Sequence, residues 1–197
     1  MATERTEKYW TVEEYLAYEQ ETGIKHEYID GEIFAMSGGT DNHSEIAVNC
    51  TTELSVQLRG RAGCRRFNSD MKVKISERKY VYPDFSIVCG KAEFSNESNT
   101  MLTNPTLVAE VTSDSSKSYD KIKKAEFYRS LPSLQIYLII DQDRPHAELY
   151  VRQEKVWIFQ EFNSLEDVLP LDVIGCTLPM SEVYRDIELH DVESDFD

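Results

Sequence analysis

The segment TLVAEVTS, residues 106–113, constrains the fold more than any other part of the chain. Its apolar residues are typical of a strand that is buried on both faces, which requires covering layers on either side of the sheet. Glu110 lies within this apolar run. Burying an ionised carboxylate is costly unless a partner offsets the charge. Glu110 therefore needs a protein cation, a proton or a metal ion, and each alternative implies a different function.

Length and hydropathy indicate a globular protein. A chain of 197 residues is long enough for one domain with its own core. We predict a single domain over residues 1–190 and an acidic tail over 191–197. No segment approaches the roughly 18 apolar residues of a membrane span, and the start, MATERTEKYW, lacks the apolar part of a signal peptide. We therefore expect a cytoplasmic protein that is not bound to a membrane.

Helical and strand patterns alternate along the chain. Thr11 followed by Glu14 forms a capping box and predicts a helix over 11–21. Further helices are predicted from Thr40 or Asp41 to near Gly60, over 119–131 and over 181–187. Strands are predicted over 64–69, 71–75, 80–90, 106–113, 135–141, 146–153 and 156–162, and Asp30-Gly31 predicts a hairpin within 25–36. Residues 91–105 are polar and predict a loop. The fold class is α/β or α+β, with a central mixed sheet flanked by helices.

The four cysteines are scattered. Cys50, Cys64, Cys89 and Cys176 form no CxxC pair and have no histidine at zinc-site spacing. We expect them to be reduced, mostly core residues.

Charge is distributed unevenly. The formal net charge of −15 argues against a protein that coats nucleic acid by bulk attraction. Between residues 59 and 79, however, eight basic residues face only two acids. This basic segment predicts either a solvated face of strands or a surface that contacts phosphates. The candidate nucleic-acid-binding residues within it are Arg59, Arg61, Arg65, Arg66, Lys72 and Lys74.

A second carboxylate lies at the edge of another apolar run. Asp84 follows Pro83, which belongs at a strand start or bulge because it has no backbone N–H. If the strands carrying Asp84 and Glu110 pair, the two carboxylates face each other and cannot both stay ionised without a cation. A shared proton suits acid catalysis, as in a glycosidase, and a salt bridge would be purely structural. A divalent ion beside a phosphate-binding surface is instead suited to hydrolysing phosphodiesters.

Hydrolysis of a phosphodiester also needs a cation near the developing negative charge. Lys124 shares one helical face with apolar residues three to seven positions further on, so we expect it to point inward.

These residues resemble the PD-(D/E)XK nuclease superfamily and, more narrowly, its Uma-two family of restriction endonucleases. The resemblance runs from about residue 10 to residue 185 and covers nearly the whole chain. The segments that carry it are EYIDGEIFAM, TDNHSEI, SDMKVKI, YPDFSIV, VAEVTSDSS and YDKIKKAEFYRSLPSLQIYLIID.

The resemblance implies roles for five residues. Asp84 and Glu110 would bind Mg²⁺ or Mn²⁺, and Lys124 would replace the superfamily's usual lysine, whose position is Thr112 here. Glu27 and His43 match further family positions, as an auxiliary acid and a substrate-side group; an ordinary structural role is the alternative for each.

The expected function is a metal-dependent DNA endonuclease that uses a metal-activated water. The alternative is a catalytically inactive nuclease-fold module that binds nucleic acid or protein. A two-carboxylate glycosidase is the third hypothesis and has the least support in the sequence. Cutting both strands with one site per chain would favour a homodimer.

Overall fold

The computed structural model describes residues 8–36, 38–60, 63–113 and 124–189. Its larger sheet has six strands, in the order β11 (Val156–Phe162), β10 (Ala147–Gln153), β9 (Ile136–Asp141), β8 (Leu107–Thr112), β6 (Phe85–Cys89) and β3 (Cys64–Asn68). Strands β8 and β9 are parallel, and the other neighbouring pairs are antiparallel. This is the mixed sheet that the sequence predicted.

A smaller sheet carries the predicted hairpin. Its order is β2 (Glu32–Ala35), β1 (His26–Ile29), β5 (Lys79–Val81), β4 (Lys72–Ser76) and β7 (Met101–Leu102). The hairpin between β1 and β2 turns at Asp30 and Gly31, whose φ angles of 51° and 105° suit a two-residue turn with positive φ at both positions. Strand β7 lies in the stretch that was predicted as a loop, and it pairs through only two residues.

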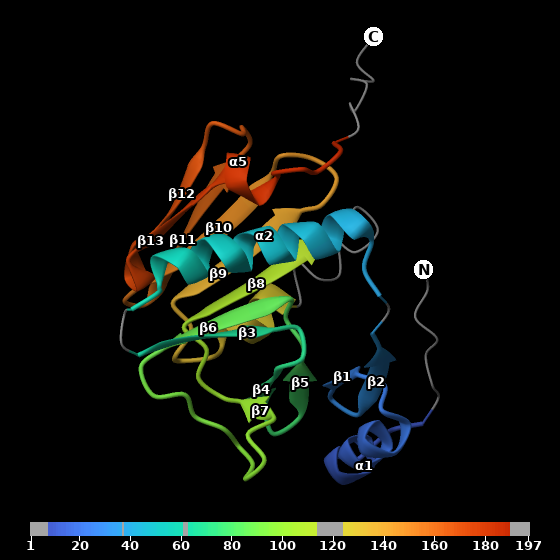
Figure 1. Cartoon of the computed structure of the whole chain (residues 1–197). Coiled ribbons are helices and arrows are strands. Elements are labelled where there is room, and N and C mark those ends of the chain that lie inside the picture. The colour runs from blue at the N-terminus through green and yellow to red at the C-terminus, as the bar shows by residue number, and fades with distance from the viewer. Residues whose placement is uncertain (1–7, 37, 61–62, 114–123, 190–197) are drawn as a thin grey trace.

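The helices cover both faces of the larger sheet. On one face, α2 (Asp41–Gln57) packs with α5 (Met180–Val183) and with a hairpin of β12 (Val168–Leu171) and β13 (Cys176–Pro179). On the other face, α4 (Ala125–Arg129) packs with residues of β4, β5 and β7. Figure 1 shows α2 lying across the larger sheet, with α1 (Val12–Thr22) beside β1 and β2 at the lower right. Strand β8 is thus buried on both faces, as its sequence requires.

Two N-terminal helix signals predicted from the sequence are confirmed. Thr11 caps α1 through a reciprocal capping box with Glu14, in which each residue's backbone N–H donates to the other's side chain. Thr40 caps α2 by accepting a hydrogen bond from the backbone N–H of His43.

The strand predicted over 80–90 is divided in the structure. Strand β5 ends at Val81 in the smaller sheet and β6 begins at Phe85 in the larger one, so Tyr82, Pro83 and Asp84 form the crossing between the two sheets. Pro83 cannot donate to a sheet ladder, which explains why a continuous apolar run changes sheets at this point. The division puts Asp84 immediately before the first residue of β6, between the two sheets.

The expectation that all four cysteines are reduced is wrong for two of them. Cys64 and Cys89 form a disulfide, while Cys50 and Cys176 are free and buried. The pairing follows from topology, because β3 and β6 are antiparallel neighbours and their register puts Cys64 directly opposite Cys89. A separation of 25 residues along the chain gave no sign of this contact.

Two parts of the predicted domain organisation, the acidic tail over 191–197 and the domain boundary at residue 190, lie outside the described residues. The β12–β13 hairpin was not anticipated, because VLPL and CTLP are short and the first contains a proline. Within the described part of the chain, no helix is long and apolar enough to cross a bilayer.

Candidate active site

Asp84 and Glu110 are brought together by strand pairing. Strand β6 pairs with β8 so that Phe85 lies opposite Ala109. Extending this antiparallel register by one residue places Asp84 opposite Glu110, as the sequence predicted for paired strands. Glu110 lies on the sheet face that α4 covers, since Ala109 and Val111 on either side of it pack under α2, whereas Asp84, just before β6, contacts His43 of α2.

Asp84 is held by two hydrogen bonds. The backbone N–H of Val111 donates to its Oδ2 at 2.6 Å, and His43 Nε2 lies 2.9 Å from its Oδ1. The hydrogen bond that His43 donates to Asp84 raises the pKa of His43 above its ordinary value of 6.5, because the carboxylate stabilises the imidazolium. His43 therefore fixes the orientation of Asp84 from the first turn of α2.

Glu110 is a buried carboxylate with one engaged oxygen. Its Oε1 accepts a hydrogen bond from the Tyr128 hydroxyl at 2.8 Å and lies 3.4 Å from Lys124 Nζ. Burial raises the pKa of Glu110 to about 8, and the negative charges of Asp84 and Glu27 act in the same direction. Lys124 and Tyr128 oppose this shift. A carboxyl group in this environment gains from any additional cation placed beside it.

Lys124 links the two sheets through its ammonium group. Its Nζ lies 2.9 Å from Oε1 of Glu27, which projects from β1 of the smaller sheet. Glu27 Oε1 also accepts a hydrogen bond from the backbone N–H of Tyr82 at 3.3 Å. Lys124 is 8% exposed, which confirms that it points inward. Thr112, the superfamily's usual lysine position, is a buried threonine on β8.

The five predicted site residues thus form one connected group. His43 contacts Asp84, Asp84 accepts from the residue after Glu110, and Lys124 joins Glu110 to Glu27. They come from α2, the crossing before β6, β8, the start of α4 and β1. The structure brings together residues that are up to 97 positions apart, from Glu27 to Lys124.

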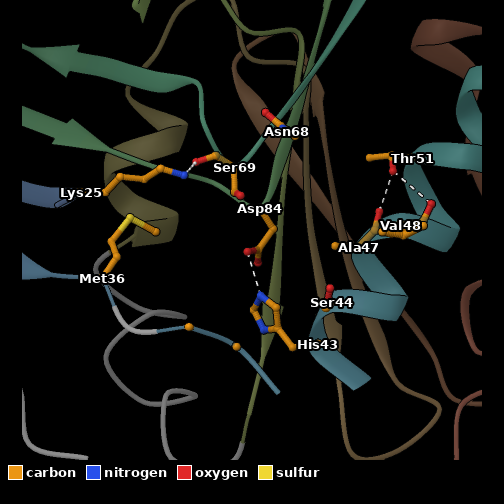
Figure 2. Close-up of a pocket in the computed structure, with 12 residues that line it drawn as sticks. Lys25, Met36, His43, Ser44, Ala47, Val48, Thr51, Asn68, Ser69 and Asp84 are labelled. Atoms are coloured by element: carbon orange, nitrogen blue, oxygen red, sulfur yellow. Dashed lines mark hydrogen bonds and ion pairs between the residues drawn. The ribbon is translucent and has the colours of Figure 1, made fainter. Parts of the chain in front are cut away.

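A cleft of about 500 Å³ opens onto two members of this group, His43 and Asp84. Figure 2 shows Asp84 and His43 pointing toward one another in it, with residues of α2 on one side and Lys25 and Met36 on the other. The amino-terminal end of α2 contributes His43 and Ser44 to the wall, next to Gly38 and Gly39. The positive end of a 17-residue helix dipole favours an anionic ligand at that wall.

Gly39 is required for the position of His43. A Cβ atom at residue 39 would lie 2.7 Å from Cδ2 and 2.8 Å from Cγ of His43, whereas a Cβ atom at Gly38 would meet nothing within 4 Å. We expect Gly39→Ala to displace the imidazole and weaken its hydrogen bond to Asp84. In metal-free protein the pKa of His43 should then fall toward 6.5, as NMR titration of the ring would measure. Gly38→Ala is the matched control, and an equal fall in both variants would contradict this account.

The oxygen donors fit a hard divalent cation. No described residue donates a hydrogen bond to Glu110 Oε2, and Oδ1 and Oδ2 of Asp84 contact His43 and the backbone of Val111. Mg²⁺ is commonly bound by one or two carboxylates together with waters and substrate phosphates, so these two acids suffice. Among described residues, no three ligand atoms from this group lie within 4.8 Å of one another, which is consistent with a two-carboxylate site.

The candidate nucleic-acid-binding residues are separated by the fold. Arg59, Arg65 and Arg66 are exposed, the last two on the edge strand β3. Lys72 is buried and forms an ion pair with Glu19 of α1, and Lys74 pairs with Glu77 at 2.7 Å. Arg61 lies outside the described residues. The segment is therefore not one continuous basic surface.

Two contacts at the candidate site were missed in the sequence. Tyr128 was not among the candidate site residues, yet its hydroxyl donates a hydrogen bond to Glu110. Its position four residues after Lys124 was the available signal, because residues at that spacing share a helix face. Lys25, whose Nζ donates to the backbone oxygen of Ser69 at 3.1 Å, lines the cleft and lies in no motif that could have identified it.

Comparison with known proteins gives consistent results. The sequence profile of the Uma2 family, described as "Putative restriction endonuclease", matches residues 12–181. Two relatives come from Synechocystis sp. (strain ATCC 27184 / PCC 6803 / Kazusa). The uncharacterized protein slr1290 is 36% identical over 175 residues, covering 88% of this chain and 90% of the relative. The uncharacterized protein sll1609 is 37% identical over 158 residues, covering 79% of this chain and 89% of the relative.

A crystal structure has the same fold. It is titled a "putative nuclease belonging to DUF820" from Anabaena variabilis ATCC 29413. The TM-score is 0.71 at 20% sequence identity, and the match covers 89% of this chain and 97% of that chain.

Proposed function

Since the chain belongs to the Uma2 family, we propose that it is a metal-dependent endonuclease that hydrolyses phosphodiester bonds in DNA. The observation that carries the proposal is the pairing of Asp84 and Glu110 across β6 and β8, with Lys124 beside Glu110 and a cleft leading to Asp84.

Asp84 and Glu110 are the residues that would hold Mg²⁺ or Mn²⁺. A divalent ion bound there supplies an acidified water and a positive charge beside the scissile phosphate. Asp84 presents its oxygens at a fixed orientation, because His43 and the backbone of Val111 hold both of them. Glu110 presents Oε2, while Tyr128 and Lys124 hold Oε1 in place.

The protein's own cations complete the proposed mechanism. Lys124 carries a positive charge 3.4 Å from Glu110, where it can stabilise the negative charge that develops on the phosphate in the transition state. Glu27 fixes the ammonium group from the other side. The amino-terminal end of α2 and Gly38-Gly39 provide a wall on which a phosphate can lie. We further propose that two copies form a homodimer to cut both strands.

The alternative is an inactive nuclease-fold module that binds DNA or a protein. One observation favours it: Lys124 already forms ion pairs with both Glu27 and Glu110, so part of the buried charge is compensated without a metal.

Nicking of supercoiled plasmid tests the proposal. Tag-free protein should nick plasmid in Mg²⁺ or Mn²⁺, fail to do so in EDTA, and lose the activity in Asp84→Asn. Calorimetric titration with Mg²⁺ should show binding in the wild type and weaker binding in the variant. DNA binding that declines steeply with salt, without metal-dependent nicking, would instead support the inactive module.

A further inference from the structure

A second group of metal-ligating side chains lies outside the candidate active site. His146, Glu148 and Glu161 each offer one ligand atom, and these atoms all lie within 4.8 Å of one another. His146 Nε2 and Glu148 Oε1 are 3.5 Å apart. Within the described ranges, this is the group of three histidine, cysteine or acidic residues that meets this spacing.

Strand register places the three side chains on one face of the sheet. Glu148 of β10 lies directly opposite Glu161 of β11. His146 precedes Glu148 by two residues and therefore points to the same side. Two acids directly opposite on neighbouring strands repel each other, and a cation between them removes the repulsion.

His146 has the orientation of a metal ligand. Its Nδ1 lies 2.7 Å from Oδ1 of Asn163, an amide oxygen that can only accept. Nδ1 is therefore the donor in this contact, and Nε2 is the ring nitrogen that faces Glu148 Oε1. Metal-bound histidines are commonly held this way, with the second ring nitrogen donating to an oxygen that fixes the ring and its tautomer.

Two of the three residues are buried, and the third is exposed to solvent. His146 is 6% exposed and Glu148 is 8% exposed, so both are held rigidly by the fold. The Tyr150 hydroxyl donates to Oε2 of Glu148 at 3.0 Å, and Oε1 of Glu148 lies 3.5 Å from His146 Nε2. Glu161 is exposed, which gives an ion and its remaining water ligands access from solvent.

This group is separate from the candidate active site. Glu161, Glu148, Ile139 and Glu110 form one row across β11, β10, β9 and β8. Glu110 and Glu148 are thus two strand spacings apart, roughly 10 Å between Cα atoms, with the apolar side chain of Ile139 between them. The two ions of a two-metal catalytic site lie about 4 Å apart, so this group is not the second half of such a site.

We propose that His146, Glu148 and Glu161 form a second site that binds a divalent transition-metal ion such as Zn²⁺. One imidazole nitrogen and two carboxylate oxygens favour Zn²⁺ over Mg²⁺, which prefers oxygen ligands alone. Three protein ligands leave at least one coordination position for water. The ion joins β10 to β11 at the end of the hairpin near Asn163.

Zinc titration of a protein with a silenced active site tests this inference independently of nuclease activity. Tag-free Asp84→Asn/Glu110→Gln protein should bind one equivalent of Zn²⁺ in calorimetry, and Zn²⁺ should raise its thermal unfolding midpoint. Adding Glu161→Gln should weaken binding at least tenfold and remove the rise. Because Glu161 is exposed, this variant should fold normally.

Three further variants test the proposed ligands and provide a control for Zn²⁺ binding. His146→Gln should also weaken Zn²⁺ binding at least tenfold, and Asn163→Ala should weaken it about 10- to 100-fold by releasing the ring. Glu154→Gln makes the same chemical change at an exposed residue at the other end of the hairpin and should leave binding unchanged. Equal Zn²⁺ binding in Glu161→Gln, His146→Gln and the control would overturn the proposal, as would no binding in the parent protein.

Discussion

Glu110→Gln is expected to reduce metal-dependent nicking of supercoiled plasmid by about 10³-fold. A neutral amide is a poor ligand for a hard divalent cation, so the variant loses one of the two proposed metal ligands. Calorimetric titration should show a parallel loss of Mg²⁺ binding. The matched control is Glu126→Gln, which makes the same change on the exposed side of α4 and should keep full activity.

Loss of activity in Glu110→Gln should not reflect unfolding. The amide oxygen can still accept from Tyr128, and Lys124 retains its ion pair with Glu27. Circular dichroism should therefore match the wild type, and unfolding should remain a single cooperative transition. Unchanged nicking in this folded variant would refute the assignment of Glu110 as a metal ligand.

The same variant should alter how stability depends on pH in metal-free protein. The folded pKa of Glu110, about 8, lies above its ordinary value of 4.5, so between these values the folded state binds more protons than the unfolded state. The wild-type free energy of unfolding should therefore fall as pH rises from about 4.5 to 8. Glutamine does not titrate, so denaturant unfolding across this range should show a smaller fall in Glu110→Gln. An identical pH profile would contradict the raised pKa.

Lys124→Met is expected to have two large effects. It removes the ammonium group between Glu27 and Glu110 and leaves buried acidic charge without this cation. Breaking a buried ion pair from one side costs about 3–5 kcal/mol, so the free energy of unfolding in EDTA should fall by about 3 kcal/mol. Nicking should fall by about 10²-fold or more, because the transition state loses a preorganised positive charge.

A second substitution separates the structural effect of Lys124 from its catalytic effect. In Lys124→Met/Glu27→Gln, one of the two uncompensated acids becomes neutral, so part of the lost stability should return. Nicking should remain low, because no cation has been restored. Recovery of nicking together with stability would show that Lys124 acts only through the fold.

The larger sheet could be predicted because its strands have strong local patterns. The apolar runs that form β8 and β9 have the composition of strands buried on both faces, and the structure buries all their residues. The capping box at Thr11 and the Asp30-Gly31 turn depend on neighbouring residues, so both were predicted correctly. The β12–β13 hairpin was missed because its short strands become regular only when they pack beside α2.

Individual residues of the candidate site were predicted from the sequence, but their contacts with one another were not. The chemistry of an acid in an apolar strand identified Glu110, and helical spacing indicated that Lys124 points inward. The contact between Lys124 and Glu27 depends on how the smaller sheet packs near the start of α4, which no local pattern encodes. Lys72 illustrates the converse, because its place in a basic segment suggested a surface role while α1 supplies Glu19 to a buried ion pair.

The sequence by itself determined that β8 and β9 are buried on both faces, where α1, α2 and most strands of the larger sheet lie, and that a carboxylate in apolar surroundings needs a cation or a proton. These properties follow from composition and periodicity over a few residues. Only the tertiary structure decided that Pro83 marks a change of sheet, that Cys64 faces Cys89, and that Glu148 faces Glu161 near His146. Each of these depends on which strands become neighbours and in what register, and burial of the whole core selects that pairing.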